Sequence, residues 1–117
     1  MTLRALQPEA LAALDAAIAR GRAVVDPELL AGAQARIDWL VGEGPQPAAP
    51  GDARQAAVFA VLEQELIDVA RLDDDTVRAA AGLAGGAQVA DLVMTSYALE
   101  ARTRLEVASA RLLGGAR

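Results

Sequence analysis

The longest regular pattern of apolar and polar residues runs from Asp52 to Leu72 and predicts an amphipathic helix. Pro50 and Gly51 interrupt any helix before it, and Asp52 can cap its first turn. When residues are placed at intervals of about 100° around a helix, one arc contains Ala56, Val58, Phe59, Ala60, Leu62, Leu66, Ile67, Val69 and Ala70. The opposite side contains Arg54, Gln64, Glu65, Asp68 and Arg71.

One charged residue, Glu63, falls inside this apolar arc near Ala56 and Ala70. A carboxylate in such a position must be paired, protonated or beside a cavity, because burial without a partner is costly. Three interpretations remain open: a structural ion pair, a general acid or base with a raised pKa, and simple exposure. If the central and last helices pack together, the partner of Glu63 would be Arg104.

Similar patterns predict four further helices. The first spans residues 8–20, begins at Pro8 and ends at Gly21, after a flexible lead of residues 1–7. The second spans residues 27–41, with Asp26 as its cap, and a Pro- and Gly-rich loop of residues 42–51 follows it. A short helix covers residues 76–83 and a long one covers residues 87–113. Residues 73–75 are three aspartates, which suit the cap of the short helix and lack the spacing of a calcium loop.

No segment has a strand pattern, so the sequence predicts an all-α fold in a single domain, residues 1–117. The expected core is the central helix packed antiparallel against the last helix. The last helix has two apolar sides, which indicates two neighbours. Its first stripe includes Val89, Leu92, Leu99 and Val107, and the stripe on nearly the opposite side consists of Met94, Ala98, Ala101, Leu105 and Leu112. The second stripe predicts an interface in a homo-oligomer, most simply a dimer.

Composition restricts the possible chemistry. The 54% hydrophobic and 23% charged content is typical of a globular chain. Cysteine and histidine are both absent, which excludes disulfides, thiol nucleophiles, Cys/His metal sites and catalytic triads. A net charge of −5 argues against a nucleic-acid partner. No cofactor or metal site is expected, and neither is thiol peroxidase activity.

No segment has about 18 uninterrupted apolar residues, so no membrane span or membrane partner is expected. Pro8, Glu9 and Asp15 occupy positions where a signal peptide would be apolar. The expected location is the cytoplasm.

The chain resembles the carboxymuconolactone decarboxylase / alkylhydroperoxidase-D-like family, in its small actinobacterial variety. Three segments carry this resemblance: DPELLAGAQARIDWLVG, LEQELIDVARLDDDTVRAA and VADLVMTSYALEARTRLEVASARLL. Together they extend from Asp26 to Leu113, and Tyr97, Glu100, Arg104 and Leu105 have a spacing similar to that of the family. The resemblance implies a five-helix bundle and oligomerisation.

The chain departs from this family where the family's peroxidases carry a redox-active C-x-x-C helix with a nearby histidine. Here the segment GEGPQPAAPGDA takes that place, so the redox helix looks deleted and no residue inherits its role.

Three functions are compatible with the sequence. The first is a non-catalytic, truncated family member that serves as an oligomeric interaction or accessory subunit, with a hetero-partner as one possibility. The second is a cysteine-independent decarboxylase, lyase or isomerase, with Glu63 as acid or base, Arg104 as carboxylate clamp and Tyr97 nearby. The third is a binder of a small carboxylated molecule, using the cavity that the missing helix would leave.

Overall fold

The computed structural model describes residues 3–114, and these residues form an all-α bundle without strands. Five principal helices occur, as the sequence predicts, together with one short turn of α-helix and one 3₁₀ turn. The elements are α1 (Leu3–Leu6), α2 (Pro8–Val24), α3 (Pro27–Leu40), α4 (Ala53–Asp68), η1 (Val69–Arg71), α5 (Asp74–Ala84) and α6 (Gly86–Leu113).

Three aspartates begin three of the helices, and each accepts a hydrogen bond from a free backbone N–H of the first turn. Asp26 accepts from Glu28 N at 2.9 Å, and Asp52 accepts from Gln55 N at 2.8 Å. Asp73 accepts from Thr76 N at 2.7 Å. The predicted caps are therefore confirmed, and the expectation that residues 73–75 serve a helix start is confirmed for Asp73.

Two boundaries near the N-terminus differ from prediction. Residues 3–6 form the helical turn α1 inside the lead that was expected to be flexible, while residues 1–2 lie outside the described part. Helix α2 passes through Gly21 and ends at Val24. Gly21 is a packing glycine here, because a Cβ atom at this position would lie 2.2 Å from Thr95 Oγ1 of α6. The absence of a side chain lets α2 and α6 approach closely.

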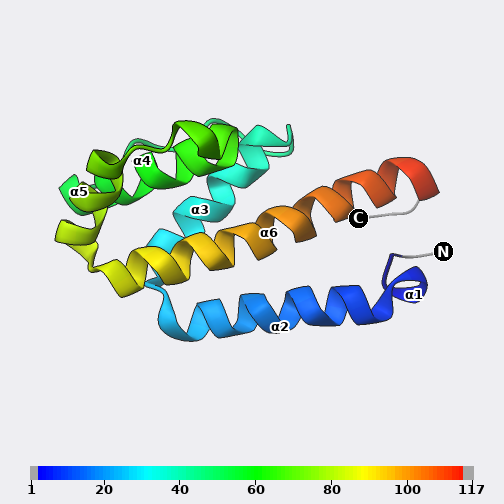
Figure 1. Ribbon diagram of the computed structural model, residues 1–117. Helices are drawn as coiled ribbons and strands as arrows, with labels where there is room; N and C mark the ends of the chain where they lie inside the picture. The colour runs from blue at the N-terminus through cyan, green and yellow to red at the C-terminus, as the bar shows by residue number, and fades with distance from the viewer. Residues whose placement is uncertain (1–2, 115–117) are drawn as a thin grey trace.

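Helix α6 runs the length of the molecule, antiparallel to α2 (Figure 1). It packs most extensively against α2 and then against α3, whereas its contact with α4 is small. The expectation that α4 and α6 form the core pair is therefore wrong. Helix α3 lies between them, and α4 packs instead against α5 and α3 (Figure 1).

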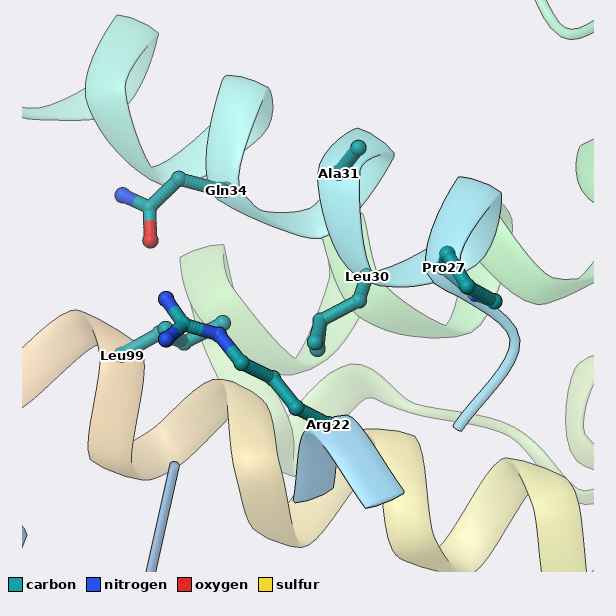
Figure 2. A pocket seen from close by; sticks show the side chains of 6 residues that line it. All are labelled: Arg22, Pro27, Leu30, Ala31, Gln34 and Leu99. Carbon is teal, nitrogen blue, oxygen red and sulfur yellow. The ribbon is translucent and has the colours of Figure 1, made fainter. Parts of the chain in front are cut away.

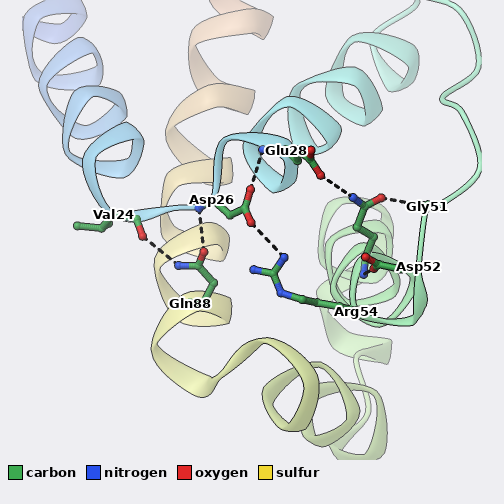
Figure 3. Close-up of polar contacts among 8 residues, drawn as sticks. Val24, Asp26, Glu28, Gly51, Asp52, Arg54 and Gln88 are labelled. Carbon is green, nitrogen blue, oxygen red and sulfur yellow. Dashed lines mark hydrogen bonds and ion pairs between the residues drawn. The ribbon is translucent and has the colours of Figure 1, made fainter.

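A polar cluster ties the α2–α3 turn to two other helices (Figure 3). Gln88 of α6 accepts a hydrogen bond from Asp26 N at 2.8 Å and donates one to Val24 O at 3.0 Å. Arg54 of α4 donates to Asp26 at 3.1 Å. The Glu28 backbone N–H and then Arg54 lower the pKa of Asp26, since both stabilise its charged form. This cluster fixes one end of the bundle.

The buried core is aliphatic apart from Phe59, and its largest fully buried side chains include Leu29, Ile37, Leu62 and Leu92. The molecule is elongated, with extents of 46 × 26 × 26 Å. Its radius of gyration of 15.0 Å exceeds the roughly 13 Å typical of a compact domain of this length. More side-chain surface is consequently exposed than in a compact monomer.

Candidate functional site

The three candidate catalytic residues do not form one site. Glu63 binds Arg36 of α3, with 3.1 Å between Oε1 and Nε, and its side chain is 56% exposed. Arg104 is also exposed, and its nearest acidic partner is Glu100 of the same helix at 3.8 Å. The predicted pair between Glu63 and Arg104 is therefore wrong, because α3 rather than α6 lies beside Glu63.

Arg36 is the buried member of the ion pair, with only 5% of its surface exposed. Its guanidinium lies 3.9 Å from the centre of the Phe59 ring and also donates to Gly32 O at 3.1 Å. A cation over an aromatic face is stabilised by the charge distribution of the ring. Because Arg36 has three partners and Glu63 faces solvent, this arrangement is structural and holds α3 to α4.

The Arg36–Glu63 pair borders a cavity of about 410 Å³ under the loop of residues 42–51. Trp39 and Ile67, both substantially exposed, line the same cavity together with the loop prolines. It lies where a cavity was expected to remain in place of a redox helix. All the charge that lines it belongs to one satisfied ion pair, so it offers no free charged group for a ligand.

The buried acid of α4 is Glu65, which the sequence pattern had placed on the polar side. It is 6% exposed, and its Oε2 has no hydrogen-bond partner in the part of the chain that the structure describes. Burial raises the pKa of the Glu65 carboxyl, and the Ser96 hydroxyl partly opposes that shift. Glu65 and not Glu63 is thus the acid inside the apolar face.

The hydrogen bonds of Ser96 show how Glu65 is accommodated. Ser96 Oγ lies 2.5 Å from Glu65 Oε1 and 2.7 Å from Val93 O. A serine hydroxyl has only one proton to donate. Glu65 Oε1 and Val93 O therefore compete for the proton of the Ser96 hydroxyl. The Glu65 carboxyl is thus buried with few hydrogen bonds, which agrees with the upward direction of its pKa shift.

Tyr97 connects this buried acid to the surface of α6. Its interaction with Glu65 raises the pKa of the Tyr97 hydroxyl, and nearby Glu100 adds to the shift. The Tyr97 ring is 44% exposed. A raised pKa keeps the phenol protonated and makes it a weaker acid, which does not favour a role in acid–base catalysis. This group is better suited to packing than to catalysis.

The exposed side of α6 carries a continuous row of apolar residues. Their spacing of three or four residues keeps them on one face of the helix. We call this row the α6 seam; it consists of Ala90, Met94, Tyr97, Ala101, Leu105, Ala108 and Leu112. Met94 and Leu112 are 70% and 82% exposed, and Ala101 is half-buried.

One residue of the predicted interface stripe is buried within the chain itself. Met94, Ala101, Leu105 and Leu112 belong to the seam, but Ala98 is 8% exposed and packs in the core. The cause is the close approach of α2 at Gly21 and Thr95, which covers the neighbouring turn of α6. Tyr97 takes the place of Ala98 on the exposed face.

Other sites and relatives give no further assignment. Within residues 3–114, no group of three acidic residues is placed to hold a metal ion. None of the described helices is long and apolar enough to cross a membrane. Comparison with family models, with curated proteins and with solved structures finds no match for this chain.

Proposed function

We propose that this chain is a non-catalytic helical protein that acts as an oligomeric interaction or accessory subunit. In this proposal two copies associate through the α6 seam, with their α6 helices antiparallel. The observation that carries the proposal is the seam itself, an apolar face of roughly 33 Å at 1.5 Å per residue. Exposed apolar surface of this extent marks interaction sites. An enzyme using Glu63 and Arg104 lacks support, because those side chains do not converge.

The exposed area of the chain is suited to a partner. Its accessible surface is 6902 Å², whereas a monomeric protein of this mass exposes about 6000 Å². The difference of roughly 900 Å² is close to the area of about 800 Å² that each partner contributes to a standard interface. A second copy bound to the seam would lower the accessible surface of each chain to about the area that a monomeric protein of this mass exposes.

The seam is symmetric about Ala101, which favours a second copy over an unrelated partner. Every other seam position has a counterpart at the same distance on the other side of Ala101. A two-fold axis at Ala101 would therefore place Tyr97 opposite Leu105 of the partner subunit and Met94 opposite Ala108 of the partner subunit. Most of these pairs join a small side chain to a large one, as close packing requires.

Charge along the edge of the seam agrees with the antiparallel orientation. Glu100 and Arg104 flank the seam on the same side of α6 and lie close to the proposed axis. Within one chain their separation is 3.8 Å, at the limit of an ion pair. Across a two-fold axis, Glu100 would face Arg104 of the partner subunit, giving two further opposite-charge pairs.

The resemblance to carboxymuconolactone decarboxylase / alkylhydroperoxidase-D-like proteins belongs to the same proposal. Members of that family oligomerise, and a truncated member without the redox helix would keep assembly and lose peroxidase chemistry. The absence of cysteine and histidine from the chain supports this combination.

Light scattering coupled to size-exclusion chromatography tests the proposal. We expect a mass of about 24 kDa, twice the 12.0 kDa of one chain. Leu105→Glu in the seam should give the monomer mass, because a buried unpaired charge is costly at an interface. Leu83→Glu is the matched control, since Leu83 is an exposed leucine on α5 outside the seam. A monomeric wild type, or equal effects of the two variants, would refute the proposal.

A further inference from the structure

A second cavity, of about 400 Å³, lies between the end of α2, the first half of α3 and the middle of α6. It is lined by Arg22, Pro27, Leu30, Ala31, Gln34 and Leu99 (Figure 2). This volume is in the range of small-molecule sites, which are mostly apolar with a few polar groups. Leu30 and Leu99 are 9% and 5% exposed and form an ordered apolar floor.

Arg22 supplies the cavity with a positive charge. Its guanidinium reaches across Leu99 towards Gln34 (Figure 2). It has no ion-pair partner among residues 3–114, whereas Arg102 in the adjoining cavity binds both Asp15 and Glu106. An arginine held over apolar side chains with its fork unoccupied matches a carboxylate, which accepts two parallel hydrogen bonds from it.

Gln34 limits what else the ligand can carry. Its Nε2 donates to Asp38 at 2.8 Å and to Thr103 at 3.1 Å. Asp38 can only accept, so this contact fixes the orientation of the amide and turns the Gln34 oxygen towards Arg22 (Figure 2). The adjoining cavity also shares Arg22 and Gln34, and it is lined by Asp38 and by Asp15 and Glu106, which are both paired with Arg102. A second negative charge on the ligand would meet the Gln34 oxygen and the Asp38 carboxylate and be repelled.

We propose that this cavity binds a small monocarboxylate with an apolar body, with Arg22 holding the carboxylate and Leu30 and Leu99 contacting the body. Leu99 is on the buried side of α6, away from the exposed seam. Binding at Arg22 therefore does not depend on dimerisation, and the two can be measured separately on the same protein.

Hexanoate is a suitable probe, and its binding to the full chain can be followed by amide chemical shifts. We expect saturable shifts at residues around Arg22 and Gln34. Arg22→Gln should weaken binding roughly tenfold to a hundredfold, the range for hydrogen bonds to a charged group. Hexanol, which lacks the charge, and the dicarboxylate adipate should both bind more weakly than hexanoate.

Arg20→Gln is the matched control for this substitution. Arg20 is on the same helix, is exposed and has no ion-pair partner in the described part, but it lines a different cavity. Arg20→Gln should keep the affinity of the wild type, and both variants should keep its melting temperature. The proposal is overturned if hexanoate gives no saturable shifts, if hexanol or adipate binds as well, or if Arg20→Gln weakens binding as much as Arg22→Gln.

Discussion

Replacing Gly21 by alanine should destabilise the protein, although alanine is the better helix former. The new Cβ would lie 2.2 Å from Thr95 Oγ1, 2.3 Å from Cγ2 and 2.8 Å from Cβ. Rotating the Thr95 side chain would only replace the clash with Oγ1 by a clash with Cγ2. The Thr95 hydroxyl also donates a hydrogen bond to Asp91 O at 2.7 Å. Helices α2 and α6 must therefore move apart.

The magnitude follows from two opposing terms. Overpacking costs about 1–3 kcal/mol, and the upper end applies because three atoms clash at a buried residue. The gain in helix propensity from glycine to alanine is about 1 kcal/mol. The net loss is about 1–2 kcal/mol, which lowers the melting temperature by roughly 4–8 °C in a domain of this size.

Gly82→Ala is the control, because Gly82 is also inside a helix but has no neighbouring atom within 4 Å of a Cβ. The same substitution there should raise stability by about 0.4–1 kcal/mol. Thermal unfolding followed by circular dichroism measures both variants. Adding Thr95→Ala to Gly21→Ala should recover part of the loss, since it removes two of the clashing atoms. If Gly21→Ala stabilises the protein as much as Gly82→Ala, the close approach of α2 and α6 is wrong.

The other predictions concern Glu65 and the ion pair between Arg36 and Glu63. Folding raises the pKa of the Glu65 carboxyl. The stability that Glu65 contributes is complete below the pKa of the unfolded chain and is lost as the pH rises through the pKa of the folded protein. Glu65→Gln should therefore be more stable than the wild type at pH 8 and show no such advantage at pH 4 in urea unfolding; an equal difference at both pH values would contradict this. Arg36→Ala should cost about 2–3 kcal/mol through lost packing and the contact with Phe59, whereas Glu63→Gln should cost about 1 kcal/mol or less. Equal losses in chemical denaturation would show that Glu63 is as important as Arg36.

The helix starts could be predicted because they depend on local chemistry. An aspartate at the start of a helix accepts a hydrogen bond from a free backbone N–H group of the first turn, whichever neighbours the helix packs against. Asp26, Asp52 and Asp73 all behave in this way. The end of α2 was missed because Gly21 looks like a helix stop, and only the position of Thr95 shows that it is a packing position.

The buried face of α4 could not be placed from the sequence because alanine is apolar without requiring burial. The predicted apolar arc contains Ala56, Ala60 and Ile67, and these three residues shift its centre away from the core. All three are exposed in the structure. The true buried face includes Val61 and therefore also Glu65. The rotation of the apolar arc around the axis of α4 decides which acid is assigned to the buried face. The sequence pattern therefore predicts Glu63 as the candidate carboxylate, whereas the buried acid is Glu65.

The measurement that tests the proposed assembly most directly is cross-linking of single cysteines in a chain that has none. With antiparallel α6 helices related by a two-fold axis at Ala101, Ala101→Cys faces its own copy and should form a disulfide-linked dimer on oxidation. Ala90→Cys should stay monomeric on a denaturing gel, because its counterpart is Leu112 of the partner subunit. Cross-linking at Ala90 as strong as at Ala101 would indicate parallel helices, and its absence at Ala101 would contradict the seam as the interface.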